Sequence, residues 1–415
     1  MKAELLAVGS ELLDPERLET NSAYLTARLG EAGVEVFVRA VVADDLAWLT
    51  TAFQAALARA DIVISTGGLG PTEDDLTRDA AAAAVGRPLQ RRADMVEALR
   101  ARFARYGRTM APVNEKQADV IEGATVLPNP RGTAPGQRLE DRGRLLVLLP
   151  GPPAEMQPIF DDQVLPLVRE RAGGRVVRRR ELRIAGMGES DVEQVVAPIY
   201  TTFTNPRTTI LGGPGETELH LVAQGASPAE AEERLEALGS ALRARLQGAL
   251  YSEDGRRLHE VVAALLLERR LTLAVAESCT GGKLAARLTD IPGSSAFLDR
   301  GYVTYSNQAK ADMLGVDPAL FETVGAVSAE TAQAMAAGAR RASGADLAIA
   351  ITGIAGPGGG TPEKPVGLVY LATAGAAGER VRRVHFPGDR NRVRHQAVTA
   401  ALDMIRRGLL GIDPP

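Results

Sequence analysis

An alternation of short apolar segments with helical ones restricts this chain to a small set of folds. In its first part, three segments read as strands and two as helices, in the order AELLAVG, NSAYLTARLGEAG, VEVFVRAVV, DLAWLTTAFQAALARA and DIVISTGG. Strands that alternate with helices predict a parallel sheet with helices on both faces. Ligands of such sheets bind at the carboxyl ends of the strands, so the loops there are the first candidates for a site.

Two loops at those carboxyl ends stand out. The first, VGSELLD, contains Gly9, Ser10 and Glu11. The second, STGGLGPTEDDLTRDA, carries three glycines able to wrap a phosphate and two carboxylates beside them: Gly67, Gly68, Gly70, Asp74 and Asp75. Carboxylates next to a phosphate loop generally imply a divalent cation, which neutralises the repulsion. The same pattern equally describes a glycine turn before an acidic helix N-terminus.

A smaller unit begins after the turn signal RAGGR at 171–175. Its expected order is a strand (VVRRRELRIAG), a helix (SDVEQVVAPIY), two strands (RTTILG and ETELHLVAQ), a helix (SPAEAEERLEALGSALRARL) and a short strand near Leu250, which is a split βαβ plan. The GGPG turn at 212–215 resembles the GxxG loop of KH modules, and three arginines lie at 178–180. A lone GxxG between two strands is more often an ordinary turn, so we expect a spacer or dimerisation role and no nucleic-acid partner.

The third part of the chain has a serine at a strand-to-helix corner. LTLAVAES reads as a buried strand and TGGKLAARL begins as a helix does, with Ser278 between them. At such a corner the side chain projects from the carboxyl edge of the sheet, and the next backbone N–H groups stay free to bind an anion. This geometry suits a nucleophile. The alternative is that Ser278 only caps the helix.

A serine nucleophile needs a base, and Lys310 is the candidate because no histidine occurs between the two residues. Lysine can act as a base only if burial and nearby positive charge lower its pKa from about 10.4 towards neutrality. The chain has five lysines among 48 basic residues, which makes Lys310 conspicuous. The alternative is a solvated surface lysine.

Cys279, the one cysteine in the sequence, is a competing nucleophile. Neighbouring side chains on an extended segment point in opposite directions, so Ser278 and Cys279 cannot both face a substrate, and we favour Cys279 as a small buried filler. The four histidines are scattered and only His395 lies near a motif, which makes a Ser-His pair the weaker mechanism. A single cysteine excludes an intramolecular disulfide and argues against a cysteine-rich zinc site.

Five ordered motifs in the last part of the chain resemble the C-terminal domain of the CinA family. They are AESCTGG, GYVTYSNQAK, VSAETA, AITGIAGPGGGTPEKPVGLVY and FPGDRNRVR. That domain resembles a nicotinamide mononucleotide (NMN) amidohydrolase with a serine nucleophile and a lysine base, which matches the pair found above. The resemblance implies four catalytic residues: Ser278, Lys310, Ser295 and Tyr305.

Further residues are candidates for contacts with NMN. Thr352 and Gly353 follow the apolar strand DLAIAIT and precede a glycine-rich loop that can bring backbone N–H groups close to a ligand. Thr280 and Gly281 belong to the serine corner. GDRNRVRH opens the last helix, and among its arginines Arg392 is the preferred phosphate ligand. The alternatives are an ordinary surface loop and a solvated helix face.

The first part of the chain resembles the molybdopterin-binding-like domain fused at the front of CinA proteins, over residues 1 to about 168. The motifs are TNSAYL, VVADD, STGGLGPTEDDLT, NPRGTAPG and LLPGPPAEM. Molybdenum-cofactor proteins carry Gly-Gly-Thr-Gly where this chain has GGLG, which argues against a pterin ligand. The CinA version is similar to proteins that hydrolyse ADP-ribose to AMP and ribose 5-phosphate with a divalent metal.

This second resemblance implies a nucleotide site and a metal, with Mg, Mn or Co as the expected cation and no metal at the C-terminal site. The implied ADP-ribose contacts are Gly9, Ser10, Thr66, Gly67, Gly68, Gly70, Pro150 and Gly151. The implied metal-binding or water-positioning carboxylates are Asp74, Asp75 and Glu155.

Length and charge agree with a multidomain cytoplasmic enzyme. A chain of 415 residues exceeds one ordinary core. We expect an α/β protein of three domains: residues 1–170, a molybdopterin-binding-like parallel sheet domain; 171–252, a KH-like α+β linking domain; and 253–415, an α/β amidohydrolase domain. The net charge of −4 gives no general attraction to nucleic acid or membrane. No apolar run approaches the roughly 20 residues of a membrane helix, and the start is not built like a signal peptide. A homodimer is expected from the family alone.

These observations predict a bifunctional hydrolase of pyridine-nucleotide salvage. The C-terminal domain would convert NMN and water to nicotinic acid mononucleotide and ammonia, and the N-terminal domain would cleave ADP-ribose. Two alternatives stay open. One is a nucleotide-sensing or partner-binding protein linked to competence, which binds without turnover. The other is an amidase whose N-terminal domain only binds, because GGLG and the Asp74–Asp75 pair lack an obvious third metal ligand.

Overall fold

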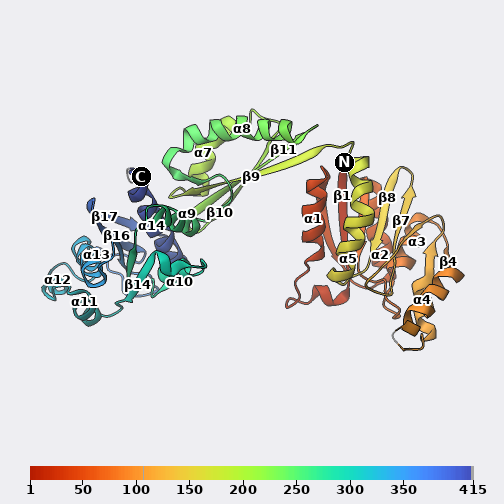
Figure 1. Ribbon diagram of the computed structural model, residues 1–415, viewed down its shortest axis with the longest axis horizontal. Helices are drawn as coiled ribbons and strands as arrows, with labels where there is room; N and C mark the ends of the chain where they lie inside the picture. Colours follow the sequence, from red (N-terminus) through yellow and green to blue (C-terminus); the bar gives the residue numbers. More distant parts are fainter. Residues whose placement is uncertain (106, 413–415) are drawn as a thin grey trace. The chain divides into compact units, whose positions relative to one another are not determined.

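The computed structural model describes residues 1–105 and 107–412. They form two compact units: Met1–Arg178 with Gln224–Glu232, and Arg179–Ala223 with Glu233–Pro415. The first unit contains the N-terminal domain. The second contains most of the KH-like domain together with the C-terminal domain, and the ribbon of each can be followed by colour in Figure 1.

The N-terminal domain is built on a six-stranded sheet of order β2-β1-β3-β8-β7-β6. Its strands are β1 (Lys2–Val8), β2 (Glu35–Val42), β3 (Ile62–Thr66), β6 (Thr125–Leu127), β7 (Gly136–Asp141) and β8 (Arg144–Leu149), and a separate ribbon is formed by β4 (Leu89–Arg91) and β5 (Asp119–Ile121). Ala7 lies opposite Thr66, and Thr66 opposite Leu149, so β1, β3 and β8 end at the same level. The loops that follow these strands are therefore neighbours.

The sheet is parallel over four strands, as predicted, but not throughout. β7 runs antiparallel to β8, and β6 antiparallel to β7. The reason is the tight turn between β7 and β8, where Arg142 and Gly143 both have positive φ (48° and 79°). Such a turn joins antiparallel neighbours directly, so this end of the sheet is a hairpin and not a crossover.

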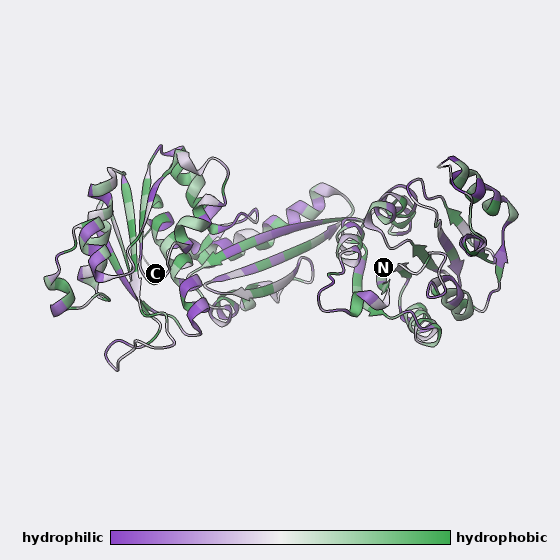
Figure 2. Cartoon of the chain, turned by 90° about the horizontal axis from the view of Figure 1, so that it is seen from below, coloured by the Kyte–Doolittle hydropathy of each residue, from purple (hydrophilic) through white to green (hydrophobic). Residues whose placement is uncertain are grey.

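Helices cover both faces of this sheet. They are α1 (Asn21–Glu31), α2 (Leu46–Arg59), α3 (Thr77–Val85), α5 (Pro153–Ile159) and α6 (Leu165–Arg171), with a 3₁₀ segment at Ser10–Leu13 and a π segment at Phe160–Val164. A further helix, α4 (Ala93–Arg105), packs against the 3₁₀ segment Pro112–Ala118 in a small cluster of its own. One core layer joins α1, α5 and α6 to the sheet, and another joins α2 and α3 to its opposite face. Because helices cover both faces, almost every residue of β1 and β3 is buried. Figure 2 shows hydrophobic residues on strands and helices alike.

The KH-like domain has the predicted order of elements. They are β9 (Val176–Ala185), α7 (Glu189–Tyr200), β10 (Arg207–Gly213), β11 (Glu216–Gly225), α8 (Pro228–Leu246) and β12 (Leu250–Ser252). The sheet order is β10-β11-β9-β12, and β11 alternates buried with half-buried residues, as a strand with one covered face does. Pro214 and Gly215 form the turn between β10 and β11.

The C-terminal domain has a five-stranded sheet of order β14-β13-β15-β16-β17. Its strands are β13 (Leu273–Glu277), β14 (Leu298–Val303), β15 (Leu347–Gly353), β16 (Leu368–Gly375) and β17 (Gly378–His385). Its helices are α9 (Leu258–Glu268), α10 (Lys283–Thr289), α11 (Asn307–Leu314), α12 (Ala319–Thr323), α13 (Ala329–Ser343) and α14 (Arg390–Leu410). The first three strands are parallel and the last two antiparallel.

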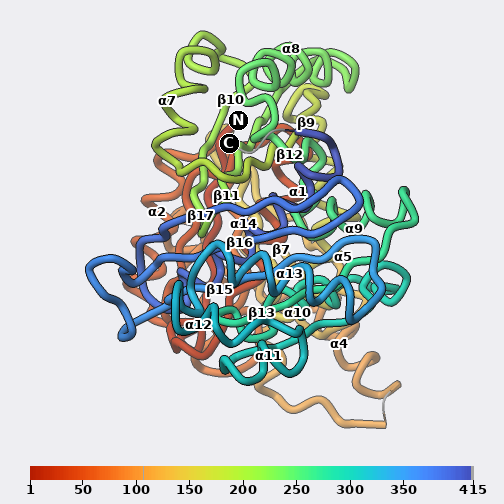
Figure 3. The backbone as a smooth tube through the Cα atoms, turned by 90° about the vertical axis from the view of Figure 1, so that its left-hand side faces the viewer, coloured from red at the N-terminus to blue at the C-terminus, as the bar shows by residue number. Residues whose placement is uncertain are grey.

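Two core layers hold this sheet. Val275 and Ile351 face α9 and α14, whereas Ala274 and Ala350 face α13, which lies along β15 and β16 in Figure 3. The alanines on the second face leave room for α13 to lie close to the strands. No helix within residues 1–105 and 107–412 is both long and apolar enough to cross a membrane.

Candidate active sites

Ser278 and Lys310 meet at the carboxyl edge of the C-terminal sheet. Ser278 follows β13, and its N–H donates to the Ile351 carbonyl at 2.9 Å, which ties the corner to β15. Lys310, on α11, has its Nζ 3.2 Å from Ser278 Oγ and 2.9 Å from the Thr304 carbonyl oxygen. The side chain of Lys310 is only 1% exposed. The two residues proposed as nucleophile and base are therefore in direct contact.

Burial lowers the pKa of Lys310 below its ordinary value, and the neighbouring Cys279 opposes this only in part. Among the described residues, no carboxylate forms an ion pair with Lys310 that would keep it charged. The cost of removing an ammonium ion from water thus favours the neutral amine, which is the form that can accept a proton. The sequence suggested that burial and nearby positive charge together would lower this pKa. In the structure, burial is the cause that lowers it.

Glu277 corrects one expectation about this corner. Its buried carboxylate accepts hydrogen bonds from the N–H groups of Gly282, Leu284 and Ala285, at 3.1, 3.0 and 2.9 Å. The first turn of α10 was expected to stay free for an anion, but the protein's own carboxylate occupies it. An acidic residue next to a helix start satisfies orphan N–H groups, and this is the signal that could have identified Glu277 from the sequence.

The N–H groups of Cys279 and Thr280 keep no acceptor within the described part of the chain, so they remain the donors at this corner. The Cys279 side chain lies in the apolar core at 6% exposure, and burial raises its pKa to about 12. A thiol in that state is protonated at neutral pH. Cys279 therefore has the surroundings of a filler residue. The Thr280 hydroxyl is buried and has no hydrogen-bond partner in the described residues.

Two further predicted catalytic residues lie at the surface. Tyr305 is 60% exposed, and its hydroxyl accepts a hydrogen bond from Arg390, which also donates to the Gly356 carbonyl. Arg390, at the start of α14, therefore links Tyr305 to the glycine-rich loop after β15. Ser295 is exposed in a short 3₁₀ turn at Ser294–Ala296, and the described residues show no hydrogen bond from it to Ser278 or Lys310.

Thr352 and Gly353 lie at the end of β15, beside the corner. The Thr352 hydroxyl donates to the Ala326 carbonyl at 2.7 Å. A Cβ on Gly353 would lie 2.8 Å from the Leu368 carbonyl oxygen, so packing against β16 requires glycine there. Gly281 has φ +58, and a Cβ there would lie 3.4 Å from Arg394.

The structure brings Arg394, and not Arg392, to the serine corner. Arg394 Nη2 donates to the Thr280 carbonyl at 2.6 Å, and its buried Nε has no partner in the described residues. The Arg392 side chain lines a different cavity. Residues two apart on a helix point roughly 200° apart, so only one of these arginines can face Ser278. That periodicity shows that the two arginines face different ways, but not which of them faces the sheet.

A cavity of about 530 Å³ lies at the carboxyl ends of β1, β3 and β8 in the N-terminal domain. It gathers almost every residue predicted there: Gly9, Thr66, Gly67, Gly68, Gly70, Asp74, Asp75, Pro150, Gly151 and Glu155. Ser10 does not line the cavity, because it is bound to Asp44. The Ser10 N–H donates to the Asp44 carboxylate, and the Ser10 hydroxyl accepts from the Asp44 N–H. A Cβ on Gly67 would lie 2.1 Å from the Val8 carbonyl oxygen, so only glycine fits between β1 and β3.

Two residues that the sequence analysis missed shape this cavity. Asn21 Nδ2 donates to the Thr66 hydroxyl and the Gly151 carbonyl at 2.9 and 2.7 Å, and its buried Oδ1 has no partner in the described residues. Arg78, at 1% exposure, donates from both terminal nitrogens to the carbonyls of Leu69 and Gly70, each at 2.8 Å. The buried guanidinium of Arg78 thus fixes the backbone of the GGLG loop.

The charged side chains that line this cavity, within the described residues, are all acidic. No lysine, arginine or histidine of the described chain lines it. The six carboxylates that do are Glu11, Glu19, Asp44, Asp74, Asp75 and Glu155. Asp75 is already engaged with the Gly70 and Thr72 N–H groups and the Thr72 hydroxyl, and Glu155 with Asn129. The Thr72 hydroxyl lowers the pKa of exposed Asp74, which is ionised at neutral pH. A bound pyrophosphate would need a cation here, so the lining fits a divalent metal.

The predicted metal residues do not form a compact cluster by themselves. Among residues 1–105 and 107–412, one group of three possible ligands lies close enough together, and it is Glu181, Glu218 and His220 in the KH-like domain. There Arg183 forms ion pairs with both glutamates, so its guanidinium already neutralises their charge. Asp74, Asp75 and Glu155 line one cavity but stay further apart.

Two relatives match the chain along almost its whole length. A CinA-like protein of Solibacter usitatus is 47% identical over 411 residues, which cover 99% of this chain and 99% of that protein. A putative competence-damage inducible protein of Acetivibrio thermocellus is 44% identical over 407 residues, which cover 98% of each. The chain belongs to the CinA family.

Three family models match successive parts of this CinA-family chain. They are the probable molybdopterin binding domain at residues 4–170, the damage-inducible protein CinA KH domain at 179–252 and the CinA C-terminal domain at 255–409. They confirm the predicted family and three-domain fold. The crystal structure of competence/damage inducible protein CihA from Agrobacterium tumefaciens is 46% identical, covers 37% of this chain and 97% of its own, and has a TM-score of 0.36. The names of these relatives specify no reaction.

The GGPG turn of the CinA KH domain is not open to solvent on all sides. Gly186 N–H donates to the Gly215 carbonyl at 3.4 Å, and a Cβ on Gly215 would lie 3.3 Å from Thr399 on α14. A GxxG loop that clamps a nucleic-acid backbone needs that space. The contact favours the expectation of no nucleic-acid partner, which stays a prediction.

Proposed function

We propose that the C-terminal domain is an NMN amidohydrolase that works through Ser278 and Lys310. The observation that carries the proposal is the 3.2 Å contact between Lys310 Nζ and Ser278 Oγ, made by a buried lysine with a lowered pKa. A surface lysine would be charged and unable to act as a base. This one is desolvated and lies within reach of the proton that it must take.

The geometry supports an acyl-enzyme mechanism. Neutral Lys310 takes the Ser278 proton as Oγ attacks the carboxamide carbon, and the N–H groups of Cys279 and Thr280 are available to the developing oxyanion. The protonated Lys310 then gives its proton to the leaving nitrogen, and ammonia departs. A water attacks the acyl-serine with Lys310 as base again, which releases the carboxylate and returns the proton to Ser278.

The identity of the substrate rests on the family resemblance, and the charges beside the corner support it. Arg394 lies next to the Thr280 carbonyl, and its buried Nε has no partner among the residues that the structure describes. Arg390 donates to Tyr305 and to the Gly356 carbonyl. These cations suit an anionic ligand such as a nucleotide. We therefore assign the phosphate contact to the Arg394 side of α14 and not to Arg392.

We further propose that the N-terminal domain hydrolyses ADP-ribose with a divalent metal. Six carboxylates and no basic residue line a cavity closed by glycine loops, which disfavours an unaccompanied pyrophosphate. Asp74, with the neighbouring cavity carboxylates, would hold the cation, which would neutralise charge on the pyrophosphate. Asn21 Oδ1 is available to accept a hydrogen bond from a ribose hydroxyl. A cytoplasmic location, expected from the sequence, and a homodimer, expected from the family alone, are further proposals.

Ammonia release from NMN by the purified full chain, with EDTA present, tests the first proposal. We expect turnover in the wild type, loss of it in Ser278→Ala and Lys310→Ala, and retention of it in Lys283→Arg, a matched change at a lysine of the neighbouring helix. A folded wild-type protein that binds NMN but releases no ammonia would contradict the amidase and favour nucleotide sensing. AMP formation from ADP-ribose in the same preparation decides whether the N-terminal domain catalyses or only binds.

A further inference from the structure

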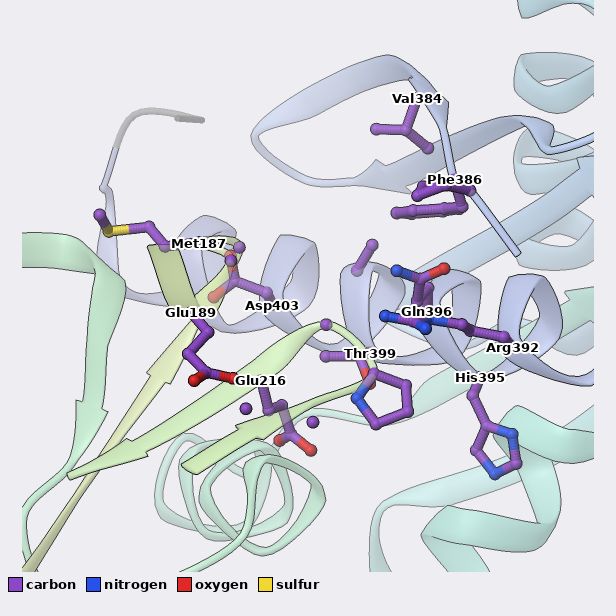
Figure 4. Close-up of a pocket in the computed structure, with 18 of the residues that line it drawn as sticks. Met187, Glu189, Glu216, Val384, Phe386, Arg392, His395, Gln396, Thr399 and Asp403 are labelled. Carbon is purple, nitrogen blue, oxygen red and sulfur yellow. The ribbon is translucent and has the colours of Figure 1, made fainter. Parts of the chain in front are cut away.

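A cavity of about 920 Å³ lies between the KH-like domain and the C-terminal domain, away from the serine corner. Its walls are the turns at 186–189 and 212–216, the last residues of β17 and one side of α14. Figure 4 shows Glu189 and Glu216 on one side, Val384 and Phe386 on another, and Gln396 on the helix. Neither Ser278 nor Lys310 lines it, so it is distinct from the proposed active site.

Three of the four carboxylates of this cavity are already satisfied by the protein. Glu216 accepts a hydrogen bond from Tyr251 at 2.8 Å and pairs with Arg287 at 3.4 Å. Asp403 is bound by Arg406 and Arg407 at 2.7 and 2.8 Å. Asp389 caps α14 through the Arg392 N–H. The fourth, Glu189, is exposed at the rim, so water solvates its charge.

Of the three arginines that line the cavity, Arg287 is the one paired with a carboxylate in the described residues. Arg382 on β17 and Arg392 on α14 line it, and in the described part of the chain neither guanidinium makes a hydrogen bond or an ion pair. Arg382 is partly buried, and burial lowers its pKa although the Asp403 charge acts against this. An arginine that is desolvated without a hydrogen-bonded partner is a ready site for an anion such as phosphate.

The remaining lining adds two features that phosphate alone would not use. Gln396 Oε1 is buried in the cavity wall and has no donor among the described residues. Val384 and Phe386 continue the β17 face that carries Arg382, because alternate residues of an extended strand share a face, and they form an apolar wall. A ligand that fits has an anionic group, a hydrogen-bond donor and a flat apolar ring.

We propose that this cavity binds a nucleoside monophosphate. The phosphate pairs with Arg382, with Arg392 as the second cation; a hydroxyl or amino group donates to Gln396 Oε1; and the base lies against Phe386. The polar parts of the ligand meet groups without a partner in the described residues, and the base meets an apolar wall. The cavity volume lies in the range of small-molecule sites. The proposal does not depend on either hydrolase activity.

Hydrogen–deuterium exchange of the full chain with AMP, inorganic phosphate and adenosine tests the proposal at the level of segments. We expect millimolar AMP to slow exchange at 186–189, 212–216 and 390–400, and phosphate or adenosine to do so less at the same concentration. Segment 66–75 reports the N-terminal cavity separately, so AMP bound there is not confused with AMP bound here.

The matched variants are Arg382→Gln and Arg383→Gln, since Arg383 is the exposed next residue on β17. Arg382→Gln should raise the AMP concentration needed for protection by about tenfold or more, whereas Arg383→Gln should not. Gln396→Leu, on α14, should also weaken AMP while leaving phosphate unchanged. The proposal is overturned if AMP protects none of these walls, if it protects Arg382→Gln as well as wild type, or if phosphate protects as well as AMP.

Discussion

Lys310 Nζ lies 3.2 Å from Ser278 Oγ although 32 residues separate the two in the chain. β13 and β14 are parallel neighbours, so the chain segments that follow them reach the same edge of the sheet. Ser278 directly follows β13, and Lys310 lies on α11, the helix that follows β14. The contact is thus a product of strand pairing, and it removes the lysine from water at the same time.

The role of Lys310 as a base can be tested separately from its positive charge. Lys310→Arg keeps a cation but cannot lose its proton near neutral pH, so NMN turnover should fall by at least about 100-fold. In the wild type, kcat/KM should decline on the acid side as Lys310 is protonated, with an apparent pKa below the ordinary 10.5 because of burial. Initial rates of ammonia release across pH measure both. A rate independent of pH, or an active Lys310→Arg, would contradict the assignment.

The same residue should lower the stability of the fold. The unfolded state binds the Lys310 proton more tightly than the native state, so the free energy of unfolding rises with pH between the lowered native pKa and 10.5. Below that window the full cost of a buried ammonium is present. Lys310→Met should therefore gain stability over wild type most at neutral and acid pH, and least near pH 10.5. Calorimetric melting of both proteins across pH checks this, and a difference that grows with pH would refute it.

Glu277 should matter to both stability and rate. Glu277→Ala leaves three N–H groups without their acceptor, which should cost about 2–4 kcal/mol in the free energy of unfolding of this domain. Glu277→Gln keeps one acceptor oxygen and should lie in between. NMN turnover should fall in the same order, because the residue adjoins Ser278. Calorimetry and ammonia release measure the two effects, and an Ala variant that melts like wild type would contradict the capping role.

Metal removal should separate the two hydrolase activities. EDTA should abolish AMP formation from ADP-ribose and leave ammonia release from NMN unchanged. Six carboxylates among the described residues line the first site, whereas the proposed chemistry of the second rests on Ser278 and Lys310. Mg²⁺, Mn²⁺ or Co²⁺ should restore the first reaction, and Asp74→Asn should weaken the restoration. Loss of NMN turnover in EDTA would mean that the C-terminal site also needs a metal.

Arg78 should act on the N-terminal reaction alone. Arg78→Met takes the donors from the Leu69 and Gly70 carbonyls and should lower kcat/KM for ADP-ribose by about tenfold or more. Arg78→Lys can satisfy one of the two carbonyls and should be intermediate. NMN turnover is the internal control. If it falls in parallel, the substitution has unfolded the chain and has not merely loosened the loop.

Much of the fold followed from local patterns. Runs such as AELLAVG and DIVISTGG are apolar on both faces and form strands with two buried faces in the structure. Cys279 was expected inside because it neighbours Ser278 on an extended segment, and it lies in the core. The split βαβ order of the KH-like domain could likewise be predicted from the sequence, since each element ends at its own turn signal. These are properties of residues a few positions apart.

What the sequence by itself determined is therefore the order of elements and the loops that carry polar chemistry. Tertiary structure alone decided that β7 pairs antiparallel with β8, that Arg394 and not Arg392 faces the serine, and that the GGPG turn meets α14. It also decided that, within the described residues, Lys310 is buried without a paired carboxylate and Arg382 lines a cavity without a hydrogen-bonded partner. Secondary structure is set by local periodicity, whereas burial and pKa depend on neighbours far along the chain, which only packing brings together.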